Sequence, residues 1–142
     1  MTPTATIWNA TGPFYTGSGA TITNLGTFEA QNDQSLFNGY GGAASTIVNT
    51  GTFRKTTGTG TTDIGLAFNN NGLLQSLSGI LGFSVSFTQT GGTTVLNGGA
   101  IASSTAMNIL GGTVSGNGTL AADVTNSGGT IAPGLSAGSL SL

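Results

Sequence analysis

The chain of 142 residues has the length of one domain, and only 4% of its residues are charged, against about 25% in ordinary soluble proteins. Its net charge of −2 rests on only two basic residues, which excludes nucleic acid as a partner because they cannot neutralise a useful number of phosphates. Histidine and cysteine are absent, which excludes Ser–His and Cys–His nucleophiles, disulfides, and thiolate or imidazole metal sites. With 37% hydrophobic residues the chain can still bury a core, despite its 26 glycines.

The N-terminal sequence Met1–Thr4 has neither a basic region nor an apolar run, so it is not expected to be a signal peptide. No segment approaches 18 uninterrupted apolar residues, so no membrane-spanning helix is expected either.

One short unit recurs along the whole chain. The stretch Ile47–Phe53 reads apolar, any, Asn, any, Gly, Thr, apolar, and Ile22–Phe28 repeats it most closely. Looser copies are Trp8–Phe14, Phe68–Leu74, Phe87–Val95, Met107–Val114 and Val124–Ile131. The first apolar positions of these seven units are 14, 25, 21, 19, 20 and 17 residues apart. A unit at such spacing indicates a repeat architecture.

The unit predicts strands joined by tight bends, because a central Gly flanked by Thr, Asn and Ile disfavours a helix. Apolar and polar residues alternate, with Ile22 and Phe28 inward and Thr23, Thr27 and Glu29 outward. The copies share one direction and few of them carry hairpin signals, so we predict a parallel stack rather than the alternative, an antiparallel β-sandwich.

The predicted fold is therefore all-β: a right-handed parallel β-helix (β-solenoid) of about seven irregular coils, each of roughly 14–25 residues. Residues 1–142 form one domain, with residues 30–44 as a protruding loop, residues 55–62 as a second protrusion, and residues 130–142 as an open C-terminal coil. The apolar residues of the unit are expected to form the core: Trp8, Ile22, Ile47, Phe68, Phe87, Met107, Val124, Phe14, Phe28, Phe53, Leu74, Val95, Val114 and Ile131.

The Asn before each Gly either adopts a left-handed backbone or hydrogen-bonds its equivalents in neighbouring coils, and we favour such a ladder. Arg54 holds the same place in its unit as Glu29 does 25 residues earlier. If these coils stack directly, the two side chains are cross-strand neighbours and form an ion pair that sets register more than stability.

Several phrases resemble the repeats of large secreted bacterial surface proteins, notably Val48–Ile64 and Phe68–Leu81. The stretch Gly111–Leu142, with its Ala132-Pro133-Gly134 near the end, is similar to the passenger domains of autotransporters and related adhesins. The resemblance covers roughly residues 21–142 and implies an exported right-handed parallel β-helix that serves adhesion or acts as a stalk. The chain lacks that family's signal sequence, translocator barrel and cap, so we expect a fragment, or a small protein that uses the same coil differently.

Enzymatic chemistry finds little support in the sequence. The acids Glu29, Asp33, Asp63 and Asp123 are scattered, whereas a carbohydrate-active β-helix needs paired carboxylates or an acidic calcium site. Glu29 and Asp33 could meet at one loop edge, but two solvated acids is the simpler interpretation. Gly116–Ala121 matches a dinucleotide fingerprint formally, yet a strand pattern follows it instead of a helix. We expect no enzyme, no cofactor and no metal.

Six threonines are candidates for one outward column: Thr27, Thr52, Thr93, Thr113, Thr119 and Thr130. Such columns occur on ice-binding solenoids, although threonine also simply suits exposed strand positions. Tyr15 and Tyr40 are the only exposed-looking aromatic candidates for a ligand-binding groove.

We therefore expect a non-enzymatic structural or adhesive solenoid at the cell surface or outside the cell. Its partners are other copies, stacked head to tail into a filament or surface matrix, or cell-surface and matrix components. The residues proposed for self-association are Trp8, Phe14, Tyr15, Leu135, Leu140 and Leu142. The alternative is an isolated adhesin passenger fragment that binds a host or glycan surface; an ice-binding solenoid and a carbohydrate-active β-helix are weaker options.

Overall fold

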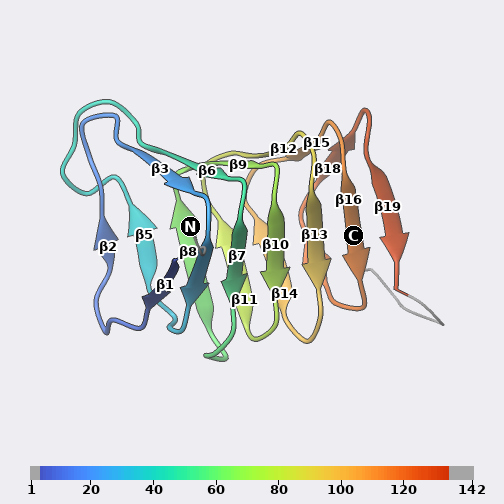
Figure 1. Ribbon diagram of the computed structural model, residues 1–142, viewed down its shortest axis with the longest axis horizontal. Helices are drawn as coiled ribbons and strands as arrows, with labels where there is room; N and C mark the ends of the chain where they lie inside the picture. Colours follow the sequence, from blue (N-terminus) through green and yellow to red (C-terminus); the bar gives the residue numbers. More distant parts are fainter. Residues whose placement is uncertain (1–3, 135–142) are drawn as a thin grey trace.

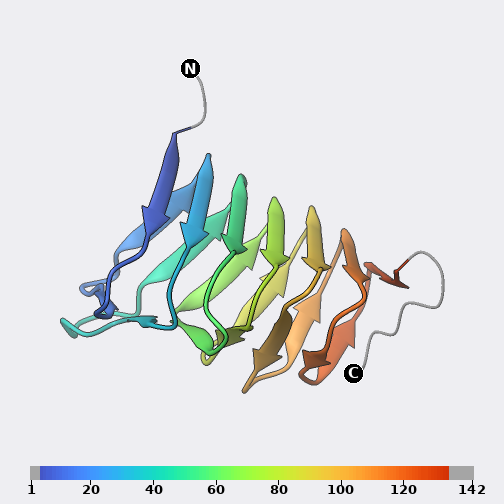
Figure 2. The same ribbon diagram turned by 90° about the horizontal axis from the view of Figure 1, so that it is seen from below.

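The computed structural model describes residues 4–134, which wind into a β-solenoid without any helix. Three parallel sheets, called A, B and C, form its sides (Figures 1 and 2). Each turn of the chain adds one strand to sheet A, then one to sheet B and then one to sheet C. Because each strand pairs with its counterparts in the adjacent turns, the backbone hydrogen bonds run along the long axis of the molecule.

Sheet A contains seven strands: β1 (Ala5–Trp8), β4 (Thr27–Ala30), β7 (Thr52–Lys55), β10 (Leu73–Ser76), β13 (Thr93–Leu96), β16 (Thr113–Gly116) and β19 (Thr130–Pro133). Sheet B contains six: β2 (Phe14–Tyr15), β5 (Ser35–Phe37), β8 (Thr61–Gly65), β11 (Ile80–Phe83), β14 (Ala100–Ser103) and β17 (Leu120–Ala121). Sheet C also contains six: β3 (Thr21–Asn24), β6 (Thr46–Asn49), β9 (Ala67–Asn70), β12 (Phe87–Gln89), β15 (Met107–Ile109) and β18 (Val124–Asn126).

The solenoid has about six turns, and the expected number of about seven was too high. The error lies in the first unit. Trp8 is in β1 of sheet A, opposite Ala30, and Phe14 is in β2 of sheet B, opposite Leu36. The Trp8–Phe14 stretch therefore spans the corner between sheets A and B, whereas the other units span the corner between sheets C and A. Two inward apolar residues separated by a bend produce the same pattern at either corner.

The remaining units align as their spacing predicts. In sheet C one inward column joins Ile22, Ile47, Phe68, Phe87, Met107 and Val124. In sheet A the matching column joins Phe28, Phe53, Leu74, Thr94, Val114 and Ile131. The assignment of Val95 to this column was wrong by one residue. Thr94 takes the inward position and is fully buried. Its polar hydroxyl is tolerated there because it donates a hydrogen bond of 2.6 Å to Gln89 Oε1.

Aromatic rings fill the middle of the core. The Phe28 and Phe53 rings are stacked with centroids 4.8 Å apart, and those of Phe68 and Phe87 are stacked at 5.8 Å. Phe83, from sheet B, meets both members of the second pair edge to face. Stacking like on like follows from the parallel register, which sets equivalent side chains about 4.8 Å apart.

Glycine is required at the corner between sheets C and A. A Cβ on Gly51 would collide with the carbonyl oxygen of Gly26, and one on Gly72 would collide with that of Gly51. The backbones of successive corners lie too close for any side chain, which explains why the repeated unit keeps a Gly at this place.

The expected loop at residues 30–44 is only partly a loop. Its middle is strand β5, whose Leu36 is fully buried, so the interval completes sheet B. The part that does protrude is residues 38–45, which lies beside residues 16–20 at the corner between sheets B and C (Figure 1, upper left). Backbone hydrogen bonds of 2.8 Å join the two loops, from Ser18 N to Gly41 O and from Gly19 N to Ala43 O. Of the expected open coil, residues 130–133 form β19, and residues 135–142 lie outside the described part.

Candidate functional site

A ladder of amide side chains runs through the interior beside the apolar column of sheet C. Asn24 Nδ2 donates to Asn49 Oδ1 (2.7 Å), Asn49 Nδ2 to Asn70 Oδ1 (2.8 Å), and Asn70 Nδ2 to Gln89 Oε1 (3.2 Å). Asn49, Asn70 and Gln89 are fully buried. The predicted ladder is therefore present, and the alternative of a left-handed Asn is not, since Ser18 is the one non-glycine residue with positive φ in residues 4–134.

The ladder has a direction and two different ends. Every amide nitrogen donates toward the C-terminal end, and Gln89 finishes the series by donating to the backbone oxygens of Gly111 and Thr113. Ile109 replaces the amide in the next turn, and Asn126 restores it in the last one. These hydrogen bonds satisfy polar groups that would otherwise be costly to bury, and they couple each turn to the next.

The Glu29–Arg54 pair lies on the outer face of sheet A. The two residues are register partners, and Arg54 donates to Glu29 Oε2 from Nη2 (2.5 Å) and from Nε (2.9 Å). Gln31 and Thr56 also donate to Glu29 Oε1. The hydrogen bond from Gln31, followed by that from Arg54, lowers the pKa of the Glu29 carboxyl below its ordinary value.

Lys55, the next residue, points inward and is fully buried, which the sequence did not predict. Its Nζ has three N–H donors and lies within hydrogen-bonding distance of four oxygen atoms: Asp33 Oδ1 (2.7 Å), Asn32 O (2.6 Å), Thr57 O (2.9 Å) and Thr62 Oγ1 (2.9 Å). The loop at 55–62 thus folds around the ammonium group. Ala30 and Ser76, its register partners in the adjacent turns, are small and leave room for the lysine stem.

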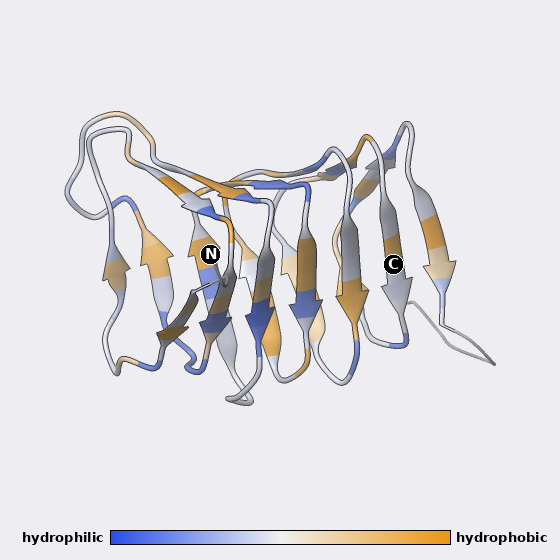
Figure 3. Cartoon of the chain, viewed as in Figure 1, coloured by the Kyte–Doolittle hydropathy of each residue, from blue (hydrophilic) through white to orange (hydrophobic). Residues whose placement is uncertain are grey.

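Three of the four carboxylates are each bound by a different polar side chain. Glu29 is bound by Arg54 and Asp33 by Lys55, while Asp63 accepts a hydrogen bond of 2.8 Å from Ser84. The hydrogen bond from Lys55 is the largest influence on the pKa of the Asp33 carboxyl and lowers it. The hydrogen bond from the backbone N–H of Gly60 lowers this pKa further. Within residues 4–134 no group of three or more acidic side chains is placed to hold a metal ion. Figure 3 shows strongly hydrophilic residues in the C-terminal halves of β4, β7 and β10, among other places.

The expected outward threonine column is present in part. Thr27, Thr52, Thr93, Thr113 and Thr130 align in register on the outer face of sheet A. Leu73 interrupts the column between Thr52 and Thr93. Thr119 lies elsewhere, directly before β17 of sheet B. The adjacent outward column is chemically mixed, with Glu29, Arg54, Gln75 and Val95, so the face is not a regular threonine array.

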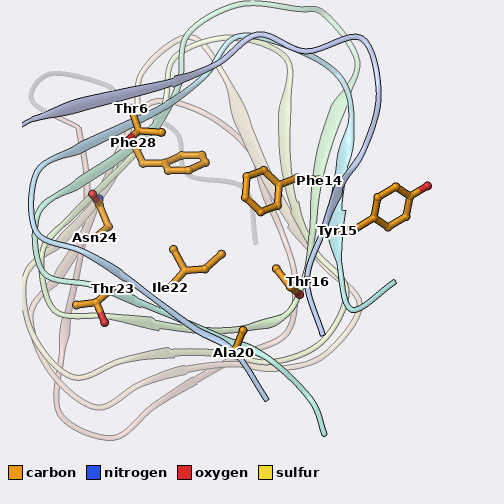
Figure 4. Close-up of a pocket in the computed structure, with 9 residues that line it drawn as sticks. All are labelled: Thr6, Phe14, Tyr15, Thr16, Ala20, Ile22, Thr23, Asn24 and Phe28. Carbon is orange, nitrogen blue, oxygen red and sulfur yellow. The ribbon is translucent and has the colours of Figure 1, made fainter. Parts of the chain in front are cut away.

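The N-terminal end of the solenoid is open to its interior. A hollow of about 440 Å³ lies inside the first turn, and it is lined mostly by apolar atoms (Figure 4). Phe14, Ile22 and Phe28 point into it, and Asn24, the first member of the ladder, stands at its edge. Among the described residues, β1, β2 and β3 each pair with one neighbouring strand, as do β17, β18 and β19 at the other end. Within the described part of the chain, both ends of the solenoid are therefore edges of parallel sheets.

The residues proposed for self-association have different surroundings. Trp8 is only 5% exposed and meets Phe14 and Phe28 edge to face, so as it stands it belongs to the core and offers no contact surface. Phe14 is 38% exposed and faces the hollow, whereas Tyr15, 45% exposed, points outward (Figure 4). Leu135, Leu140 and Leu142 lie outside the described residues.

An aromatic cluster occupies the outer face of sheet B at the same end. The Tyr15 ring lies 4.9 Å from that of Phe37 and 5.6 Å from that of Tyr40, and Tyr40 is 77% exposed. Sequence reasoning identified the two tyrosines separately but missed their contact, because β2 and β5 are too short to show a repeat.

A search of the described residues for a helix long and apolar enough to cross a membrane finds none.

The ladder predicts a specific loss of stability. In Asn49→Ala the buried Asn70 Oδ1 and the Leu73 carbonyl both lose their donor, which should cost about 1–3 kcal/mol for each unsatisfied group. Urea unfolding followed by circular dichroism measures the loss. The matched control is Asn69→Ala, at an exposed asparagine directly before the ladder residue Asn70, and it should change stability by less than about 0.5 kcal/mol. Equal stability of the two variants would contradict a structural role for the ladder.

The two ion pairs predict an acid-sensitive fold. A carboxyl with a lowered folded-state pKa stabilises the native state above its unfolded value near 4, and this stability is lost as the pH falls through the lowered folded value. The urea midpoint should therefore drop between pH 7 and pH 3, and the drop should be smaller in Asp33→Asn, which has no carboxyl to titrate there. An identical drop in variant and wild type would show that Asp33 contributes nothing to it.

In a comparison with known proteins, no family model, curated protein or solved structure matches this chain. The likeness to autotransporter passengers therefore stays a resemblance carried by the repeats themselves.

Proposed function

We propose that this protein is a non-enzymatic structural rod of the cell exterior, whose copies join end to end into a filament or surface matrix. The observation that carries the proposal is the pair of open ends. Among residues 4–134 each end presents strand edges that lack a second partner, and at the N-terminal end they surround an apolar hollow. Such an edge is a template for pairing with another chain.

The direction of the strands makes the two ends complementary. Strands within each sheet are parallel, so the C-terminal edge of one copy meets the N-terminal edge of another in the same orientation as two successive turns. A contact between different faces of identical subunits does not close on itself, and it therefore propagates a filament. The scarcity of charge favours such contacts, because little electrostatic repulsion opposes them.

The side of the rod suits an extracellular setting. Arg54 is held by its ion pair within β7, and Lys55 is fully buried, so the chain's two sites for a trypsin-like protease lie in a paired strand. Stability comes from backbone pairing, stacked apolar side chains and the amide ladder, none of which needs a reducing or an oxidising compartment. The resemblance to passenger repeats supports the same location.

A second candidate function is adhesion to a host or glycan surface. The cluster of Tyr15, Phe37 and Tyr40 favours it, since exposed aromatic patches on otherwise polar surfaces are typical of interaction sites. The cluster faces sideways, so adhesion and end-to-end association can coexist.

The test of the main proposal is assembly as a function of concentration, followed by sedimentation velocity and negative-stain electron microscopy. The wild type should form rods longer than one solenoid, whose six turns span roughly 29 Å at a spacing of about 4.8 Å. Ala20→Asp should shift the chain to single particles, because Ala20 lines the hollow and is exposed, so the new charge would be buried only in the joint.

Thr90→Asp is the matched control, since it adds the same charge at an exposed corner in the middle of the rod. It should assemble like the wild type. Single particles of the wild type at every concentration, or equal assembly of all three proteins, would overturn the proposal.

A further inference from the structure

The last strand of sheet C repeats the first. Strand β18 reads Val124-Thr125-Asn126 and strand β3 reads Ile22-Thr23-Asn24. In each strand the apolar residue and the Asn take register positions of the inward columns, and the Thr takes a position of the outward column. Inside the rod, β3 pairs with β6, whose Ile47 and Asn49 stand opposite Ile22 and Asn24. Strand β18 of one copy therefore carries the side chains that fit the free edge of β3 in another copy.

The direction of the amide ladder supports the same match. Each amide nitrogen donates toward the C-terminal end, which leaves Asn24 Oδ1 at the N-terminal end without a donor among the hydrogen bonds of residues 4–134. At the other end, Asn126 folds back on its own turn: its Nδ2 donates to Gly129 O over 3.0 Å, and its Oδ1 accepts from Gly129 N. The N-terminal end therefore offers Asn24 Oδ1 as a hydrogen-bond acceptor. The C-terminal end offers the Asn126 amide as a donor, and in the described chain sheet C has no later strand to receive it.

A constraint arises in sheet A. The described chain both begins and ends in this sheet, which has seven strands where sheets B and C have six. If β18 pairs with β3 of the next copy, then β19 and that copy's β1 claim the same place, beside β4. Only one of the two strands can occupy it.

Strand β19 fits that place better than β1 does. Its Thr130-Ile131 repeats the outward Thr and inward apolar residue of Thr27-Phe28 in β4. Strand β1 instead sets the polar Thr6 opposite Phe28, and its first three residues are exposed. Trp8 is the one β1 residue that is well buried.

We infer that copies join by strand exchange, in which β18 extends sheet C onto β3 of the next copy and β19 replaces that copy's β1 against β4. This inference rests on the proposed end-to-end function and specifies its joint. Asn126 then donates to Asn24 Oδ1 of the next copy, so the amide ladder resumes across the junction. Displacement of β1 moves Trp8, the protein's single tryptophan, out of its contact with Phe14 and Phe28.

Engineered disulfides test the register directly, because the chain has no cysteine of its own. Thr23 and Thr125 are both exposed, and the inference sets them opposite one another on neighbouring parallel strands. Their Cα atoms would be about 4.8 Å apart, within the range that a disulfide spans. Mild oxidation of the double variant Thr23→Cys/Thr125→Cys should give a ladder of covalent oligomers, whereas each single variant should stop at dimers.

The competing joint has its own pair of positions. If β19 instead pairs with an undisplaced β1, the existing register sets Ala132 opposite Ile7, and Ile7→Cys/Ala132→Cys should form the oligomers. Tryptophan fluorescence separates the two joints without any substitution. Strand exchange predicts a red shift of the Trp8 emission as the protein concentration rises, and the undisplaced joint predicts no shift.

Oligomers from the Thr23/Thr125 pair together with the red shift are the expected result. Oligomers from the Ile7/Ala132 pair with constant fluorescence would overturn strand exchange and leave end-to-end association standing. Assembly of the wild type with neither pair cross-linking would also overturn it. Absence of any assembly in the wild type would instead reject the proposed function itself.

Discussion

The parallel pairing of each turn with the next is the constraint on which the rest of this structure depends. Since pairing holds every residue about 4.8 Å from its equivalents, each position has to be compatible with copies of itself. Phenylalanine rings stack, amides hydrogen-bond in series, and glycines leave room for the neighbouring backbone. The unit repeats in the sequence because stacked rings, amides hydrogen-bonded in series and closely approaching glycines each require the same kind of residue in successive turns.

Positions that break a column show how strict the constraint is. Lys55 lies between Ala30 and Ser76 and has no like neighbour. Two loops supply three oxygen atoms around its ammonium group, and strand β8 supplies a fourth. Thr94 replaces an apolar residue in sheet A, and its hydroxyl is bound by Gln89. A polar residue is accepted inside this rod only where the structure provides its partners.

Much of the fold follows from the sequence, and the failures have physical reasons. The columns headed by Ile22 and Phe28, the Asn ladder and the contact between Glu29 and Arg54 could be predicted, because the corner between sheets C and A carries a recognisable glycine. Sheet B went unnoticed, since its strands are as short as the two residues of β2 and no fixed motif marks them. Trp8 was misplaced for the same reason: its distance to Phe14 fits a unit of the other corner.

The candidate site was less predictable than the fold. The burial of Lys55 depends on Asp33 in the preceding turn, and the cluster of Tyr15 and Tyr40 depends on two loops that pair only in three dimensions. The Lys55–Asp33 pair and the contact between Tyr15 and Tyr40 each join residues more than 20 positions apart, so no local sequence pattern predicts them. The proposed joint, in contrast, can be read from the likeness of Ile22–Asn24 and Val124–Asn126 once the sheet order is known.

The central claim is that this rod completes its ends with other copies of itself. Amide hydrogen exchange, followed residue by residue over a range of protein concentrations, tests that claim most directly. If the claim holds, protection of the amides in β3 and β18 rises with concentration, while that of β9 and β12 in the middle of the rod is high throughout. Protection of the end strands that does not depend on concentration would contradict it.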